Sequence, residues 1–185
     1  LTEGCDRIVA TVAVPHVPAS WLDALPVGGR LVTTLTGTNI IVSAEKQKEG
    51  NARGRVEHCL AGFMHPRPGP GDYPPGVGKL LSIAREQDGE YVTTGRHPVL
   101  DVERAWELSS LVGLLAPGVV HDYWEEHSQR TAVMVHADGS WARATAVGTD
   151  QPLVHQSGPR RLWDLLDQVR THWLTHGELP VRGAP

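Results

Sequence analysis

The sequence predicts an α/β protein in two parts. A strand–helix–strand unit with an antiparallel strand pair comes first, and a smaller α+β part follows. Two runs rich in valine, isoleucine and threonine flank a short helical segment near the start of the chain, a pattern typical of strands in a buried parallel sheet. A proline- and glycine-rich segment then divides the chain, and the hydrophobic pattern changes beyond it.

The opening strand–helix–strand unit is delimited by proline and glycine. The first strand is expected over residues 6–14 and ends at two prolines, because proline cannot continue a hydrogen-bonded ladder. A short helix over 19–25 and a Gly-Gly turn lead to a β-branched strand over 30–36. Strands connected in this way pair in parallel, with a right-handed crossover.

An antiparallel pair is expected next, and then a domain boundary. Its arms are residues 40–44 and 55–64, and the charged, glycine-containing segment 45–53 connects them. The boundary falls in HPRPGPGDYPPGVG, which can form neither a helix nor a central strand. We therefore predict a first domain over 1–68, a linker over 69–78 and an α+β extension over 79–185.

The extension is predicted to combine two helices with three short strands. An Asp-Gly pair between apolar runs, at 138–139, predicts a hairpin. The last helix has Leu162, Leu165, Leu166, Val169 and Trp173 on one face, with Gly177 placed as a C-cap glycine. The expected helices are residues 102–115 and 159–176, and the expected strands are 119–124, 131–136 and 141–146.

Composition excludes two classes of partner. The 185 residues include 17 Lys/Arg and 21 Asp/Glu, for a formal net charge of -4, and no clustered basic face points to nucleic acid. No apolar run approaches the ~20 residues that span a bilayer, and no signal peptide opens the chain, so no membrane partner is expected.

Cys5 and Cys59 lie in apolar runs. We expect two reduced, buried thiols in a cytoplasmic protein, with one disulfide as the alternative.

The stretch from Asp6 to Gly37, DRIVATVAVPHVPASWLDALPVGGRLVTTLTG, carries a family resemblance. Small residues run into two prolines three apart, a Pro-Val-Gly-Gly-Arg turn precedes the second strand, and FMHPR follows at 63–67. In these features the chain resembles the protein-L-isoaspartate O-methyltransferase family of class I S-adenosylmethionine-dependent methyltransferases. The hairpin at 138–143 and the helix start at 158–164 are similar to an extension on relatives associated with modified-peptide biosynthesis.

The resemblance implies a C-terminal fragment of such an enzyme. The fold expected is the C-terminal half of a Rossmann-like methyltransferase sheet, a βαβ unit plus an antiparallel pair, followed by the α+β extension. The family's S-adenosyl-L-methionine is bound by a glycine-rich loop and an acidic residue, both expected upstream of Leu1. Gly69-Pro70-Gly71 lacks the strand-to-helix context of such a loop. The isolated chain is therefore expected to bind the cofactor poorly, to be inactive alone and to be marginally stable, with unpaired strand edges.

The acceptor side of the site is expected at the carboxyl end of the first strand, where doubly wound sheets bind ligands. The resemblance places a peptide or protein substrate with an aspartyl or isoaspartyl carboxylate there. Small residues would admit a peptide backbone, and the prolines would stiffen the loop. The predicted substrate-binding residues are Thr11, Val12, Ala13, Val14, Pro15 and His16.

No catalytic residue is assigned, because the expected reaction needs none. A carboxylate with a pKa near 4 is already an ionised nucleophile at neutral pH, and alignment with the methyl donor can supply roughly 7–11 kcal/mol. His16 either hydrogen-bonds the substrate carboxylate or is an exposed loop histidine.

Two further hypotheses concern metal and partner binding. His172 and His176 are four apart on the last predicted helix, but no third ligand accompanies them, so no metal site is predicted. The six tryptophans are expected mostly in the core. The alternative function is a non-catalytic peptide- or partner-binding module made of residues 79–185, which has its own elements and no recognisable catalytic residues.

Overall fold

The structure is a computed structural model that describes residues 5–64 and 77–184. It divides into two compact units. The first contains residues 5–64 together with 180–184, and the second contains residues 77–179. The α/β class predicted from the sequence is confirmed, with a mixed sheet in the first unit and an antiparallel sheet with helices in the second.

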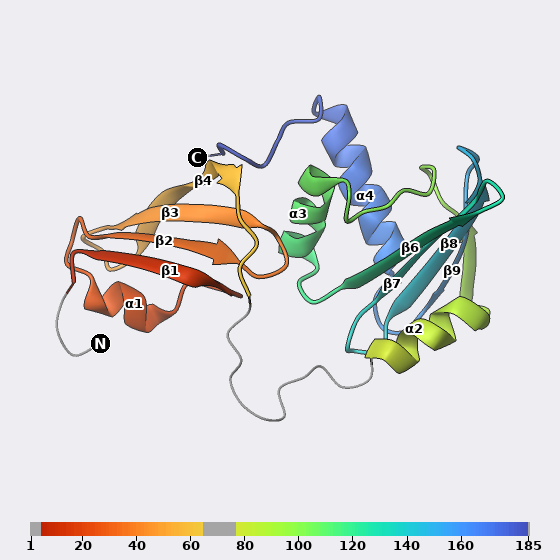
Figure 1. Cartoon of the computed structure of the whole chain (residues 1–185), viewed down its shortest axis with the longest axis horizontal. Helices are drawn as coiled ribbons and strands as arrows, with labels where there is room; N and C mark the ends of the chain where they lie inside the picture. The colour runs from red at the N-terminus through yellow and green to blue at the C-terminus, as the bar shows by residue number, and fades with distance from the viewer. Residues whose placement is uncertain (1–4, 65–76, 185) are drawn as a thin grey trace. The chain divides into compact units, whose positions relative to one another are not determined.

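The first unit is a four-stranded mixed sheet in the order β1-β2-β3-β4 (Figure 1). Strand β1 (Arg7–Val14) pairs in parallel with β2 (Arg30–Leu35), and helix α1 (Ala19–Ala24) connects them. The next two strands, β3 (Ile40–Lys46) and β4 (Ala52–Leu60), continue the sheet in antiparallel order. The predicted βαβ unit and antiparallel pair are both present.

Leucine and isoleucine side chains form the core of the first unit. Leu31 of β2 is completely buried, and Leu25 and Ile40 are exposed by only 2% and 1%. Leu25 directly follows α1, and its carbonyl accepts a 2.8 Å hydrogen bond from Lys46 Nζ. This bond fixes the end of the crossover helix to the end of β3.

The antiparallel strands differ in extent from the prediction. Both reach into the segment 45–53 that the sequence assigned to a connection, and Glu45 pairs in register with Arg53. Charged residues continue a strand when their side chains face solvent, so polarity alone did not mark its end. The second arm stops at Leu60 rather than Met64, and the Met64 carbonyl instead accepts a 3.1 Å bond from the Ala13 N–H. Of FMHPR, residues 65–67 lie outside the described part.

The last described residues belong to the first unit. Val56 N donates to the Ala184 carbonyl at 2.9 Å, and Gly183 N donates to the Val56 carbonyl at 3.0 Å. The sequence had grouped these residues with the C-terminal extension.

Both cysteines are free, but Cys5 is half-buried and Cys59 on β4 is exposed. The expectation of two buried thiols was therefore wrong, because an apolar run on an outer strand need not have both faces covered.

The second unit is a five-stranded antiparallel sheet covered on both faces. Its strand order is β5-β9-β8-β7-β6. Helix α2 packs against Val133, Val135 and Trp141 on one face, and α3 and α4 pack on the other (Figure 1). The elements are α2 (Val77–Glu86), β5 (Tyr91–Thr94), α3 (Trp106–Leu115), β6 (Val120–Glu126), β7 (Gln129–Val135), β8 (Trp141–Val147), β9 (Leu153–Ser157) and α4 (Leu162–Thr175).

Several elements of the second unit match their predictions. The β7–β8 hairpin turns at Gly139, whose φ of 91° requires glycine. Helix α4 is followed by Gly177 at φ 74°, as expected for a C-cap glycine. Of the six tryptophans expected mostly in the core, only Trp141 and Trp163 are fully buried, and Trp106 is 62% exposed.

Three elements were not predicted, namely α2, β5 and β9. The predicted linker 69–78 lies outside the described residues except for 77 and 78, which begin α2. Helix α3 begins at Trp106 rather than at Val102, because the side chain of Asp101 accepts the Glu103 N–H at 3.1 Å and holds a turn there. No helix in the described ranges is long and apolar enough to cross a membrane.

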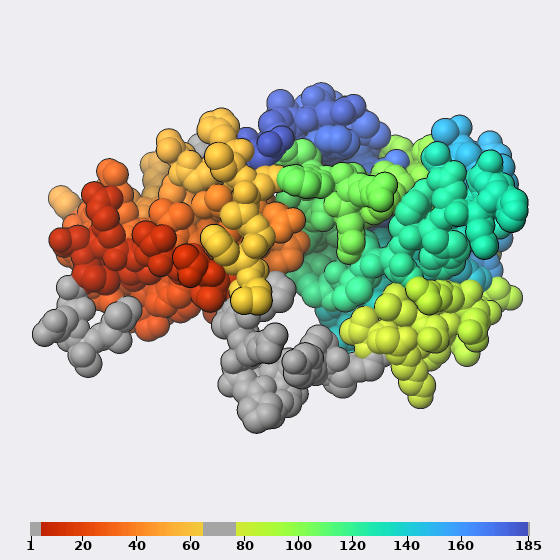
Figure 2. All heavy atoms as spheres, in the orientation of Figure 1, coloured from red at the N-terminus to blue at the C-terminus, as the bar shows by residue number. Residues whose placement is uncertain are grey.

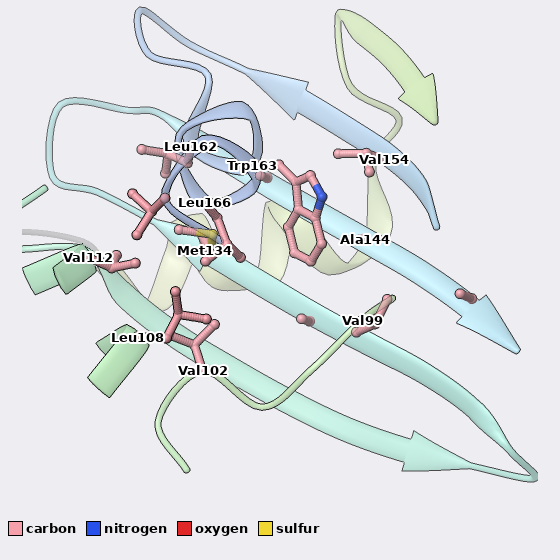
Figure 3. Packing of buried hydrophobic residues seen from close by; sticks show 14 residues of the cluster. Val99, Val102, Leu108, Val112, Met134, Ala144, Val154, Leu162, Trp163 and Leu166 are labelled. Atoms are coloured by element: carbon pink, nitrogen blue, oxygen red, sulfur yellow. The ribbon is translucent and has the colours of Figure 1, made fainter. Parts of the chain in front are cut away.

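The main core of the second unit centres on Trp163 of α4 (Figure 3). Small residues on β8, including Ala142 and Ala144, let the helix approach the sheet, and both are fully buried. The side-chain oxygen of the buried Gln156 accepts a 2.8 Å hydrogen bond from the backbone N–H of Trp163. Its side-chain nitrogen donates to the Asp164 carboxylate at 2.8 Å. This amide satisfies one of the free N–H groups at the helix start, where Arg161 provides no side-chain cap.

Truncating a leucine to alanine on α4 should cost more unfolding free energy at a buried position than at an exposed one. Leu166 is completely buried and Leu174 is 43% exposed. Leu166→Ala should lower the free energy of unfolding by about 2–5 kcal/mol because it leaves a cavity. Leu174→Ala, the control on the same helix, should cost under about 1 kcal/mol. Urea unfolding followed by tryptophan fluorescence measures both, and equal losses would contradict the packing described.

Candidate functional site

The candidate site lies where the two parallel strands of the first unit end. Ala13 pairs with Thr34 and Val14 with Leu35, so β1 and β2 finish side by side. The Thr36 N–H then donates to the Val14 carbonyl at 3.0 Å. Carboxyl ends of parallel strands are where open α/β sheets bind ligands. The parallel connection is therefore what makes this end of the sheet the candidate.

A bulge in β1 shapes the approach to these strand ends. Val9 pairs with Val32 but Ala13 pairs with Thr34, so the register shifts between Val9 and Ala13. The Thr33 hydroxyl donates to the Val12 carbonyl within this irregular stretch, at 3.3 Å. Bulges are frequent next to active sites, where they redirect side chains.

The predicted substrate-binding residues divide into two groups. Thr11, Val12, Pro15 and His16 are exposed, whereas Ala13 and Val14 are only 3% and 4% exposed. An approaching ligand can touch the exposed four directly. Ala13 and Val14 form the support beneath them, and the atoms of β1, drawn in red, lie at the surface of the first unit (Figure 2).

Two buried hydroxyl groups at the end of β2 were not among the predicted residues. The Oγ1 atoms of Thr34 and Thr36 are buried and have no hydrogen-bond partner among the described residues. Thr34 itself is 1% exposed. An unpaired buried hydroxyl costs about 1–3 kcal/mol, so two at one strand end are informative. Threonine is a common strand former, and the sequence alone therefore gave these two no distinction.

The turn between β1 and α1 differs in composition from the glycine-rich loops that bind nucleotides. The turn between β1 and α1 is Pro15-His16-Val17-Pro18 and contains no glycine, so it cannot bring backbone N–H groups close to a nucleotide as a glycine-rich loop does. Helix α1 has only six residues and no side-chain cap.

The second unit contains a small cavity of about 130 Å³ beside His121. Asp101, Tyr123 and Met134 are among its other lining residues. Burial lowers the pKa of His121 to about 4, although Asp101 opposes the shift. His127 directly follows β6 and lies in a turn with φ 48°.

The histidines do not form a metal site within the described residues. His172 and His176 stack with ring centroids 4.0 Å apart, and Nδ1 of His176 lies 2.7 Å from the His172 carbonyl. No group of three His, Cys, Asp or Glu side chains in the described ranges is arranged to hold an ion.

Comparison with known proteins gives one structural likeness. No family model matches the sequence, and no curated protein matches it. A solved structure titled protein-L-isoaspartate O-methyltransferase aligns with 97% of this chain, at 18% identity and a TM-score of 0.37. The chain spans about half of that protein, 50% of its length. A TM-score this low carries no argument about fold or activity.

Removing the unpaired hydroxyl of Thr34 should stabilise the first unit. Thr34→Val exchanges a buried, unpartnered hydroxyl for a methyl group of similar size, so the free energy of unfolding should rise by about 1 kcal/mol. Thr38 is the matched control, since its hydroxyl donates to the Leu35 carbonyl at 2.8 Å and accepts the Ile40 N–H at 3.1 Å. Thr38→Val should cost about 1–3 kcal/mol in the same urea titration. Destabilisation of both variants alike would show that Thr34 is hydrogen-bonded.

The partly buried His121 should make stability depend on pH. His121 has a folded pKa of about 4 against an ordinary value of 6.5, so below pH 6.5 the unfolded chain takes up a proton that the folded chain refuses. Stability should fall by about 2 kcal/mol from pH 7 to pH 5. His121→Asn should remove that dependence, whereas His127→Asn, at an exposed turn, should keep it. Denaturant unfolding at the two pH values tests this, and an unchanged slope in His121→Asn would contradict it.

Proposed function

We propose that the chain contributes the acceptor side of a carboxyl O-methyltransferase of the protein-L-isoaspartate type. The observation that carries this proposal is the parallel β1–α1–β2 unit, which ends in an exposed proline loop next to two unpaired threonine hydroxyls. The sequence of this unit, residues 6–37, is also the part that resembles the family. The acceptor proposed is an aspartyl or isoaspartyl carboxylate of a peptide, including a biosynthetic precursor peptide.

The proposed reaction requires the acceptor carboxylate to be aligned with the methyl group, and it does not require a general base. A carboxylate is ionised at neutral pH, and S-adenosylmethionine supplies an electrophilic methyl group when it is bound. The residues of this chain would hold the acceptor chain and its carboxylate in line. The exposed side chains of Thr11 and His16 can contact the acceptor, and Pro15 and Pro18 hold the loop between β1 and α1 in one conformation.

The donor side is proposed to lie outside the described residues. Strand β1 is an edge strand that pairs only with β2 among the described strands. Near the end of β1 the Ala13 N–H already donates to the Met64 carbonyl, so a further strand would add along the preceding residues, where Val9 is 73% exposed. Donor-binding strands that add to this edge would complete a doubly wound sheet around the strand ends.

The test is a methylation assay on a polypeptide that contains these residues together with the proposed donor side. With radiolabelled S-adenosylmethionine, an isoaspartyl peptide should gain label that base hydrolysis releases, as expected for a methyl ester. The same peptide with asparagine should gain none. Label that resists base, or no label at all, would overturn the carboxyl methyltransferase assignment.

One variant examines the acceptor side directly. Thr11 is an exposed residue of the predicted site, and Thr11→Val should raise the KM for the peptide by about two- to tenfold through loss of one hydrogen bond, with kcat less affected. Thr94→Val is the control, because Thr94 is exposed on β5 of the second unit. Equal KM values for the two variants would remove Thr11 from the site. The 185-residue chain alone should show no micromolar binding of the donor in calorimetry, and such binding would refute the placement of the donor side.

A second candidate function is a peptide- or partner-binding module formed by the second unit. The observation that favours it is a sheet with its own hydrophobic core on each face. Residues 77–179 form one compact unit with its own hydrophobic core, as domains do. Calorimetry of a precursor peptide with this segment decides the matter, and an absence of binding heat would remove the module hypothesis.

A further inference from the structure

A row of charged side chains crosses one face of the first unit's sheet. Strand register aligns them, since Arg7 pairs with Arg30, Arg30 with Glu45, and Glu45 with Arg53. Residues that pair directly across neighbouring strands point to the same face. The four side chains therefore lie next to one another from β1 to β4.

A second charged group lies beside this row. Ser43 pairs with Arg55, and the Ser43 hydroxyl and Arg55 both bond the carboxylate of Glu57. These two hydrogen bonds hold the pKa of Glu57 below its ordinary value, so its charge persists. Together the two groups line a shallow groove of about 630 Å³.

The groove has more positive than negative charge. Arg30 pairs with Glu45 at 3.3 Å and Arg55 with Glu57 at 3.2 Å. Arg7 and Arg53 have no ion pair within the described ranges, which leaves two uncompensated positive charges. Arg7 also lies directly opposite Arg30, and like charges in that position destabilise a sheet. An anion bound between them would relieve the repulsion.

We propose that this groove binds an acidic peptide segment in an extended conformation. Arginine presents a planar fork that matches a carboxylate. Arg53 and Arg55 lie two residues apart on one strand, about 6.8 Å, which is also the spacing of alternate side chains in an extended peptide. Glu45 and Glu57 in the groove disfavour a dense phosphate backbone, and the chain's net charge of -4 does the same.

The groove is separate from the candidate acceptor site. Arg7 and Arg30 are the first residues of β1 and β2, whereas the acceptor site is at the opposite ends of those strands. Seven residue steps at ~3.3 Å each put about 23 Å between them. Binding at the groove is therefore measurable without methyl transfer and does not depend on the proposed function.

The experiment is a direct titration of the 185-residue chain. The probe is a fluorescently labelled eight-residue peptide of alternating aspartate and glycine, and its reference has asparagine in place of aspartate. Anisotropy should report binding of the acidic peptide and at least tenfold weaker binding of the reference. Because exposed ion pairs are screened, raising NaCl from 20 to 200 mM should weaken binding by about fivefold or more.

Variants locate the binding in the groove. Arg7→Gln and Arg53→Gln should each weaken binding about threefold, and the double variant about tenfold. Arg104→Gln is the matched control, since the Arg104 side chain is 90% exposed and lies in the second unit. It should bind like the parent chain, and circular dichroism should confirm that all variants are folded.

Three outcomes would overturn the proposal. Equal binding of the aspartate and asparagine peptides would exclude charge recognition, even if a variant failed to fold. If Arg104→Gln weakened peptide binding as much as Arg7→Gln or Arg53→Gln, the binding would reflect general charge attraction rather than a site. Tighter binding of an eight-residue oligodeoxythymidine, lost with the same two arginines, would assign the groove to nucleic acid instead.

Discussion

The parallel pairing of β1 with β2 is the constraint on which the first unit depends. Parallel neighbours cannot be joined by a tight turn, so the chain must cross over through α1. The crossover returns both strands in the same direction and therefore gathers their carboxyl ends at one edge and their amino ends at the other. Val14 and Leu35 pair at the carboxyl ends of the strands, and Arg7 and Arg30 pair at the amino ends.

The alternation of side chains along these strands creates a second division, between faces. Leu31, one residue after Arg30, is completely buried, while the Arg30 side chain is 63% exposed. A shift of one residue in register would exchange the two. Burial of Leu31 thus fixes the register that aligns the arginines. Stability of the core and placement of the charged row have the same cause.

Sequence patterns predicted the elements whose signals are local. Prolines and a Gly-Gly turn delimit β1 and β2, and Asp138-Gly139 marks the β7–β8 hairpin. The elements that were missed depend on contacts distant in sequence. Helix α2 is held at its end by Arg143, which donates to the carbonyls of Ala84 and Arg85 at 3.1 and 2.7 Å. Strand β5 is exposed at all four positions and forms through its pairing with β9.

The candidate site shows the same limit. The position of a strand end is readable from proline, and this gave residues 11–16. Thr34 and Thr36 could not be placed at this site without knowing how β2 pairs with β1. That their hydroxyls lack partners could be seen only from the packing around them. The row from Arg7 to Arg53 combines four strands, of which no single one shows a basic cluster.

Two departures from local stability rules coincide in one small sheet. Buried hydroxyls usually find a partner, and like charges are usually not placed opposite each other, yet Thr34 lacks a partner and Arg7 faces Arg30. A sequence selected for stability alone would carry valine at the first position and an acidic residue at the second. Such departures are expected at functional sites, where a ligand completes what the free protein leaves unpaired. The arginine row faces solvent, where a ligand can reach it, whereas the Thr34 hydroxyl is buried at the strand end.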